Sequence, residues 1–250
     1  MIATFTDFGR DGPYLGQMHA VLHRLAPGLP VVDLLADAPA FDPMASAYLL
    51  AALAPEMPAG TTLLCVVDPG VGTERRALAV EADGRRFVAP DNGLLDLVIR
   101  RAAAVRAWEV VWRPDRLSAS FHGRDLFAPV AARLAAGLTP EAAGCRPSAP
   151  PVRPDWPDDL AAVVYIDHYG NAMTGLRAAG LPAGAVVEAA GRRLARARTF
   201  GDVPAGGALW YENSCGLVEI AVNGGRADRD LGLSVGAAVR VTAAGPVHTS

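Results

Sequence analysis

The sequence predicts an α/β protein in which a three-layer domain is followed by a smaller antiparallel β domain. From Met1 to about Gly137, short apolar runs alternate with segments of helical periodicity, a pattern typical of βαβ units. A proline-rich stretch between Thr139 and Asp158 interrupts this alternation. Beyond it, runs with a period of two residues are separated by glycine turns, which indicates antiparallel strands.

The elements of the first domain follow from their periodicity. The run Leu63–Val67 is almost continuously apolar, so we expect a central strand of a parallel sheet that is buried on both faces. Two segments with helical periodicity are expected to cover the sheet. The expected strands are Ile2–Thr6, Pro30–Val32, Leu63–Val67 and Arg76–Val80, and the expected helices are Leu15–Leu25 and Met44–Leu53.

The proline-rich stretch marks the domain boundary. Repeated prolines exclude a regular helix or a central strand and favour an extended connector. We therefore expect a first domain at residues 1–145, a linker at 146–157 and a second domain at 158–250. Strands of the second domain are expected at Ala161–Ile166, Ala185–Ala189, Ala208–Tyr211, Leu217–Val222 and Ala237–Val241.

Composition favours a small ligand as the partner. With 51% hydrophobic residues among 250, the chain can bury one large core or two smaller ones. A net charge of −3 leaves no basic surplus for a nucleic-acid backbone or an anionic membrane. We expect neither a signal peptide nor a membrane-spanning segment. Three cysteines without C-x-x-C spacing argue against a disulfide framework and a structural zinc site, so we expect a reducing, cytoplasmic location.

Aspartates follow four of the apolar runs, as Asp7, Asp33, Asp68 and Asp167. Capping and turn formation are the ordinary explanation, because Asp accepts hydrogen bonds from backbone N–H groups and tolerates tight turns. Asp68 differs from the other three, since the prolines and glycines that follow it already supply the turn. Arg75 lies close enough in sequence to hold the Asp68 carboxylate ionised. The carboxyl ends of parallel strands are also where open α/β sheets bind ligands.

His122 precedes a third helical segment, which stops at Gly137. The positive end of that helix dipole would disfavour an imidazolium. A neutral histidine in a cleft can accept a proton or orient a water, although a structural histidine bonded to the backbone remains an alternative. His19 and His23 have the spacing of a zinc pair on a helix, but no third ligand accompanies them and we expect no metal site.

Two polar segments of the second domain could contact a ligand. Asp167–Asn171 and Tyr211–Gly216 each combine an aromatic ring with amide or hydroxyl groups, which can stack on a purine and bind its edge or an amino-acid head group. Ordinary hairpin turns would carry similar residues. The segment Asp91–Gly93 is typical of a turn.

Taken together, these segments resemble the S-adenosyl-L-methionine hydroxide adenosyltransferase family, which is related to the bacterial fluorinases and chlorinases. The resemblance spans nearly the whole chain. It rests on ordered landmarks at Thr6–Gly9, Val67–Gly72, Ala89–Leu95, Phe121–Asp125, Asp167–Asn171, Asn213–Ser214 and Glu219–Asn223.

The resemblance implies a Rossmann-like N-terminal domain, a smaller antiparallel β-barrel-like C-terminal domain, and a homotrimer. The active sites would lie between the N-terminal domain of one subunit and the C-terminal domain of the next. S-adenosyl-L-methionine would be the substrate, with no other cofactor. Water or hydroxide would attack ribose C5′ and give adenosine and L-methionine.

The resemblance also implies roles for individual residues. The catalytic trio would be Asp68, Arg75 and His122, and Asp7 would bind the ribose hydroxyls.

The remaining substrate contacts would come from the C-terminal domain. Tyr169 would stack on adenine, while Asn171 and the Gly224 backbone would read the purine edge. The methionine end would meet Asp167 and Ser214.

Departures from the family pattern bear on the nucleophile. Gly12 stands where relatives often carry an acid, so we assign the neighbouring Asp11 no ligand role. Halogenating relatives lack the aspartate and histidine found here as Asp68 and His122, which favours water over halide. Fluorinases also carry an insertion for which the short path from Arg76 to Pro90 leaves no room.

Three alternatives remain at this stage: a halogenase of the same family, a methyltransferase that uses the same substrate, and a non-catalytic protein that binds an adenosyl ligand. Val66–Gly72 imitates the glycine-rich first motif of methyltransferases, but the sequence becomes strand-like again at Arg76–Val80 without an intervening helix. No dinucleotide or P-loop pattern is present.

Overall fold

The computed structural model describes residues 1–151, 153 and 155–242. The chain divides into two compact units, Met1–Trp156 and Pro157–Ser250. Each unit has its own hydrophobic core. Among the described residues, no helix has the length and apolar character needed to cross a membrane.

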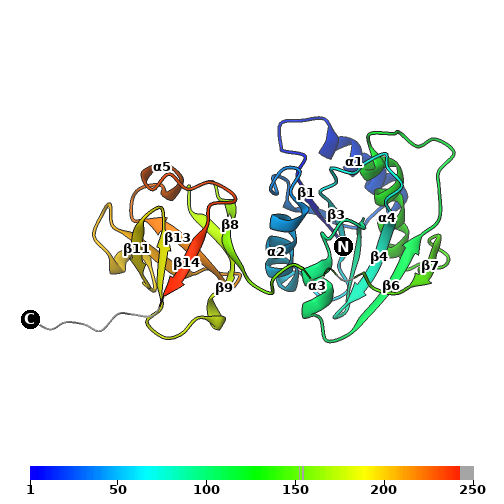
Figure 1. Ribbon diagram of the computed structural model, residues 1–250. Coiled ribbons are helices and arrows are strands. Elements are labelled where there is room, and N and C mark those ends of the chain that lie inside the picture. The colour runs from blue at the N-terminus through cyan, green and yellow to red at the C-terminus, as the bar shows by residue number, and fades with distance from the viewer. Residues whose placement is uncertain (152, 154, 243–250) are drawn as a thin grey trace, which may run out of the picture. The chain divides into compact units, whose positions relative to one another are not determined.

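The first unit is built on a seven-stranded sheet with the order β2-β1-β3-β5-β4-β6-β7 (Figure 1). The strands β2, β1, β3 and β5 are parallel to one another, while β4, β6 and β7 join by antiparallel pairing. The strand bounds are β1 Ile2–Thr6, β2 Val31–Leu35, β3 Thr62–Val66, β4 Ala77–Ala82, β5 Arg85–Pro90, β6 Val105–Val110 and β7 Cys145–Ser148.

Helices cover both faces of this sheet, which confirms the predicted three layers. α1 (Tyr14–Leu25) packs with α4 (Ala128–Ala135) on one face, and α2 (Pro43–Leu53) packs with α3 (Asp96–Arg101) on the other (Figure 1). α2 begins where the Asp42 carboxylate accepts a bond from the backbone N–H of Ala45. Its first helical residue is a proline, which has no N–H to leave unpaired.

The sheet topology places two strand ends side by side. The chain leaves β1 for β2 on one side and later returns as β3 on the other, so the strand order reverses between β1 and β3. Thr6 is the register partner of Val66, and both strands therefore end at the same level. Asp7 and Asp68, which follow them, emerge together where doubly wound sheets form their ligand crevice.

Two details differ from the sequence prediction. Asp33 lies within β2, where its carboxylate accepts a bond from Thr4 Oγ1 (2.6 Å) and contacts His19 Nε2 (2.8 Å). It is therefore not a strand-end acid. Residues 146–148 of the expected linker belong to β7, an edge strand in which Pro147 removes no central ladder bond. Residues 152 and 154 of that linker lie outside the described residues.

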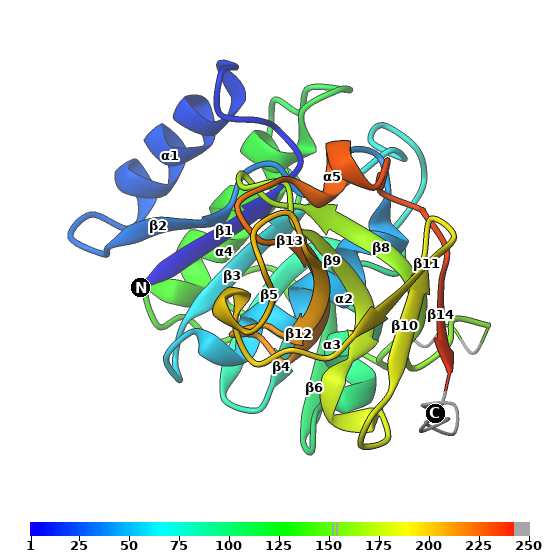
Figure 2. The same ribbon diagram turned by 90° about the vertical axis from the view of Figure 1, so that its left-hand side faces the viewer.

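The second unit consists of two antiparallel sheets, with the orders β12-β13-β9-β8 and β11-β10-β14 (Figure 2). Two isolated bridges connect them: Ala162 of β8 pairs with Ala238, just before β14, and Trp210 of β12 pairs with Arg196, just after β11. These connections give the barrel-like form. The bounds are β8 Leu160–Ile166, β9 Ala172–Arg177, β10 Val186–Ala189, β11 Arg192–Ala195, β12 Ala208–Glu212, β13 Leu217–Val222, α5 Ala227–Asp230 and β14 Val239–Thr242. The predicted strands are present; β9 and β11 were not predicted. Residues 243–250 of the expected second domain lie outside the described residues.

The core of this unit lies on one face of the four-stranded sheet, where Trp210 is fully buried among Val218, Ile220 and Val222. Alternate residues of β12 and β13 consequently face the other way. That second face carries Tyr211 and Glu219.

Gly72 is expected to be indispensable for the loop after β3. Its φ is +81°, and a Cβ there would lie 2.5 Å from the carbonyl oxygen of Ala119. Gly28 has a similar φ of +83°, but a Cβ there would meet no atom within 4 Å, which makes Gly28→Ala the matched control. Urea unfolding should show a loss of about 1 kcal/mol for Gly28→Ala, from the left-handed backbone alone. Gly72→Ala should lose about 1–3 kcal/mol more, because the Ala119 backbone must move. Equal losses would contradict this account.

Candidate active site

The loop after β3 folds back on itself, so that Arg75 lies against Asp68. Its turn is closed by the Thr73 hydroxyl, which donates to the carbonyl of Gly70 at 2.7 Å. Arg75 Nε then donates to Asp68 Oδ1 at 2.7 Å, and Arg75 Nη2 donates to Asp68 Oδ2. Both side chains are buried, with 9% of Arg75 and 4% of Asp68 exposed. A two-point ion pair of this kind fixes the orientation of both side chains.

Arg75 also contacts His122. Its Nη2 lies 3.1 Å from His122 Nδ1, and the guanidinium rests 5.0 Å from the centre of the Phe127 ring. A guanidinium can only donate, so Nδ1 must be the acceptor and the proton of the neutral imidazole belongs on Nε2. The sequence prediction attributed a neutral His122 to the helix dipole. In the structure, burial lowers the pKa of His122 and the Arg75 charge lowers it further.

His122 takes its place at the start of a distorted helix. Gly123–Phe127 forms one turn of π-helix that continues into α4. Such turns are rare and occur often at functional sites.

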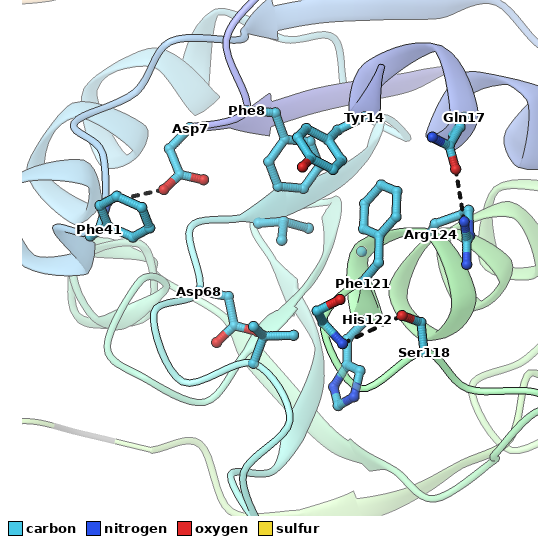
Figure 3. A pocket seen from close by; sticks show the side chains of 14 residues that line it. Asp7, Phe8, Tyr14, Gln17, Phe41, Asp68, Ser118, Phe121, His122 and Arg124 are labelled. Carbon is cyan, nitrogen blue, oxygen red and sulfur yellow. Dashed lines mark hydrogen bonds between the residues drawn. The ribbon is translucent and has the colours of Figure 1, made fainter. Parts of the chain in front are cut away.

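A cavity of about 590 Å³ opens in front of these residues (Figure 3). Asp7, Asp68 and His122 line it, and Arg75 lies behind Asp68. One oxygen of Asp7 accepts the backbone N–H of Phe41 at 3.0 Å. Burial raises the pKa of Asp7, and the nearby charge of Asp68 adds to this effect. Two carboxyl groups in one cavity favour a ligand that carries positive charge.

Aromatic side chains form the opposite wall. The rings of Phe8, Tyr14 and Phe121 pack edge to face or tilted, with centroids 5.4–6.0 Å apart (Figure 3). Phe41 also lines the cavity, with 78% of its surface exposed and a φ of +58°. Sequence analysis gave none of these rings a ligand role, although Phe8 and Phe121 belong to the landmarks that contain Asp7 and His122.

The second unit has a cavity of its own, of about 630 Å³. All five residues that the resemblance assigns to the C-terminal domain line it: Asp167, Tyr169, Asn171, Ser214 and Gly224. None of the described residues that line it is an arginine or lysine. Tyr211 and Asn213, from the polar segment singled out in the sequence, also line it. So do Glu219 and Asn223, to which sequence analysis gave no individual role.

The Asp167–Asn171 turn is held from several sides. Asp167 Oδ1 accepts the backbone N–H of Asn171 at 2.8 Å, and Asn171 Nδ2 donates to Asp167 Oδ2 at 3.1 Å. Gly170 has a φ of +87°, and a Cβ there would lie 2.6 Å from Asp228 Oδ1. Tyr169, by contrast, leaves 73% of its surface exposed, as an aromatic platform for a planar ligand would. Among the described residues, no group of three or more His, Cys, Asp or Glu side chains could hold a metal ion.

These features define a two-domain α/β protein with an acidic crevice at the switch point of a parallel sheet and a second, polar cavity in a β-barrel-like unit. Residues 2–144 match the N-terminal domain of the SAM hydroxide adenosyltransferase family, and residues 161–240 match its C-terminal domain. The chain belongs to this family.

Relatives of known activity align over almost the full length. The (R)-S-adenosyl-L-methionine hydrolase of Thermus thermophilus is 43% identical, with 94% of this chain and 97% of the relative covered. The (R)-S-adenosyl-L-methionine hydrolase of Salinispora arenicola is 42% identical, with 97% of each covered. A fluorinase of Actinopolyspora mzabensis is 26% identical, again with 97% of each covered.

Solved structures show the same fold. An uncharacterized conserved protein from Thermotoga maritima superposes with a TM-score of 0.87 at 31% identity, covering 97% of this chain and all of that one. A conserved hypothetical protein from Thermus thermophilus superposes with a TM-score of 0.75 at 40% identity, covering 96% and 99%.

Replacing Arg75 by methionine should raise the pKa of His122, because a positive charge that opposes protonation is removed while Asp68 stays. Ring NMR titration would measure this shift, and the ¹⁵N chemical shifts would show whether the proton of the neutral ring sits on Nε2. Arg76→Met is the control, since the Arg76 guanidinium pairs with Asp91 instead. A His122 pKa that is unchanged in Arg75→Met would contradict the assigned contact.

Proposed function

We propose that this protein hydrolyses S-adenosyl-L-methionine to adenosine and L-methionine, with Asp68, Arg75 and His122 as its catalytic residues. The observation that carries the assignment is the paired Asp68–Arg75–His122 arrangement facing a cavity of nucleoside size, in a chain that aligns end to end with hydrolases of this substrate.

The charges of the cavities suit this substrate. S-adenosyl-L-methionine carries a sulfonium and an ammonium group, both positive. Asp7 and Asp68 line the first cavity, and Asp167 with Glu219 lines the second. Carboxylates near a cationic ligand stabilise it most where water is excluded. In the roles proposed here, Asp7 binds the ribose hydroxyls and Asp167 with Ser214 holds the methionine end.

The reaction is a displacement at carbon. A water oxygen forms a bond to C5′ while the C5′–S bond breaks, and the bonding pair leaves with sulfur as a neutral thioether. The attacking oxygen loses one proton and becomes the 5′-hydroxyl of adenosine. The positive charge of the sulfonium is thus exchanged for a proton that must reach a base and then solvent.

The hydrogen bonds favour Asp68 as that base. His122 Nδ1 is occupied by Arg75, and Nε2 of the neutral ring carries a proton, so His122 can donate to the water but has no free lone pair. The Asp68 carboxylate can accept a proton, and the attacking oxygen becomes strongly acidic as its bond to C5′ forms. His122 would position the water, and Arg75 would hold both partners.

Water is favoured over halide as the nucleophile, because a fixed carboxylate at the attack site would repel an anion. Three hydrolase relatives are 41–43% identical and a fourth is 28% identical, whereas the fluorinase relatives are 26% identical.

We also propose that the two cavities form one active site between subunits of a homotrimer, as the family resemblance implies. Each cavity holds only part of the predicted substrate contacts: Asp7 with the catalytic trio in one unit, and the purine and methionine contacts in the other. A cytoplasmic location stays a prediction from the cysteines, all three of which are free thiols.

Asp68→Asn should lower kcat by about 10²–10⁴-fold, the usual contribution of a general base, while KM changes little. The assay incubates protein with S-adenosyl-L-methionine in ¹⁸O-water, and the wild type should give adenosine labelled at the 5′-oxygen plus methionine. Asp91→Asn, which alters the partner of Arg76, serves as control and should turn over normally.

Other products would overturn the assignment. Full activity in Asp68→Asn would remove Asp68 from the mechanism. A 5′-halo-adenosine formed with added halide would indicate a halogenase, and S-adenosylhomocysteine formed with an acceptor would indicate a methyltransferase. Unchanged ligand would indicate a binding protein.

Subunit mixing tests the shared site. Asp68→Asn disables the first cavity and Tyr169→Ala the second, so each variant alone should be weakly active. Joint refolding should recover activity, because some interfaces then combine two intact halves. Each variant refolded alone is the control. No recovery in mixed oligomers would show that both halves come from a single chain.

A further inference from the structure

Glu219 is a buried carboxyl group that the catalytic trio does not use. Only 2% of it is exposed, yet it lines the cavity of the second unit. It lies on β13 directly opposite Tyr211 of β12 and Met173 of β9, so these side chains share a face of the sheet. Asn171 stands two residues before Met173 and closes the same cavity.

The hydrogen bonds of Glu219 all come from cavity residues. The hydroxyl of Tyr211 donates to Oε1, and Asn213 Nδ2 donates to Oε2 at 2.8 Å. The Asn171 side chain, whose Nδ2 donates to Asp167, also lies close enough to Glu219 to lower the pKa of this carboxyl. Burial raises the pKa of Glu219, whereas the bonds from Tyr211 and Asn213 act in the opposite direction.

These bonds determine which way the Asn171 amide faces. An amide has two N–H donors and one carbonyl oxygen, and carboxylate oxygens accept. Asn171 Nδ2 already donates to Asp167 at 3.1 Å, and Glu219 is a second acceptor beside it. With its N–H groups turned toward two carboxyls, Asn171 has only its carbonyl oxygen left for a ligand.

Asn213 reinforces this polarity. Its Oδ1 accepts the backbone N–H groups of Cys215 (3.0 Å) and Leu217 (2.9 Å), so its amide cannot turn over without losing both bonds. Asn213 Nδ2 therefore stays directed at Glu219, and the oxygen of Glu219 that faces it stays an acceptor even when the carboxyl binds a proton elsewhere.

We propose that Glu219 is a specificity-determining positioning residue: by accepting from Asn171 it turns the Asn171 carbonyl toward the ligand and selects a purine with a 6-amino group over one with a 6-oxo group. The 6-amino group of adenine donates to that carbonyl, whereas the 6-oxo group of hypoxanthine would face it oxygen to oxygen. This inference rests on the proposed function, in which Asn171 reads the purine edge.

The test compares the binding of adenosine and inosine by calorimetry, so that its readout needs no turnover. The intact wild-type protein should bind adenosine about tenfold or more tightly than inosine, as expected when one polar group is left unpaired. Glu219→Met, close in length and apolar, should reduce this ratio about fivefold, the effect of one net hydrogen bond.

Two further variants separate specificity from folding. Glu219→Gln keeps one acceptor oxygen, opposite Asn213, but replaces the other by an NH2 donor, so its ratio should lie between those of the wild type and Glu219→Met. Thr174→Val removes a fully buried hydroxyl that bonds the Val218 carbonyl on the neighbouring strand and does not line the cavity. It should lower the melting temperature but leave the ratio unchanged.

An unchanged ratio in Glu219→Met overturns the inference, as does equal affinity of the wild type for both nucleosides, a result that requires no variant to fold. Hydrolysis of S-adenosyl-L-methionine by the wild type is measured in parallel. If the wild type hydrolyses S-adenosyl-L-methionine but the ratio of adenosine to inosine affinity does not behave as expected, only the inference about Glu219 is wrong. If the wild type neither hydrolyses the substrate nor binds adenosine, both fall.

Discussion

The guanidinium of Arg75 is the constraint on which the arrangement of Asp68 and His122 depends. It is almost buried, it holds both oxygens of Asp68, and it donates to His122 while resting on Phe127. Because a guanidinium remains protonated and only donates, its position fixes the orientation of Asp68 and the tautomer of His122. The requirement for Gly72 follows from the same geometry, since the two loops that supply these residues touch there, backbone to backbone.

Charge also links binding to turnover. Carboxyl groups line the cavity of each unit, and S-adenosyl-L-methionine carries two positive groups, its sulfonium and its ammonium. Displacement at C5′ converts the sulfonium into an uncharged thioether, so the products have lost part of the attraction that held the substrate. A site built on carboxylates therefore favours the charged reactant over the neutral adenosine that it must release.

Much of this arrangement could be predicted from the sequence, because the signals were local. The strands Ile2–Thr6 and Leu217–Val222 have strong periodicity, and Asp68 and His122 stand beside glycines at element ends. Asp33 was misplaced because β2 is an edge strand with exposed positions, where a polar residue can interrupt the apolar run before it resumes at Leu34 and Leu35. The π-helical turn at Gly123–Phe127 has no sequence pattern that distinguishes it from an ordinary first turn.

The role of Glu219 could not be inferred in this way, because it depends on hydrogen-bond direction across three strands. In the sequence it is one polar residue in the apolar run Leu217–Val222. Only the fold shows that Asn213 is locked by two backbone N–H groups and that its amide must donate to Glu219. The backbone N–H groups of this turn thus fix the direction of the Asn213 amide. Asn213 in turn keeps Glu219 an acceptor, and Glu219 sets the direction of the Asn171 amide that faces the ligand. The role of a buried polar residue in a strand thus depends on its hydrogen-bond donors and acceptors, which the periodicity of the sequence does not reveal.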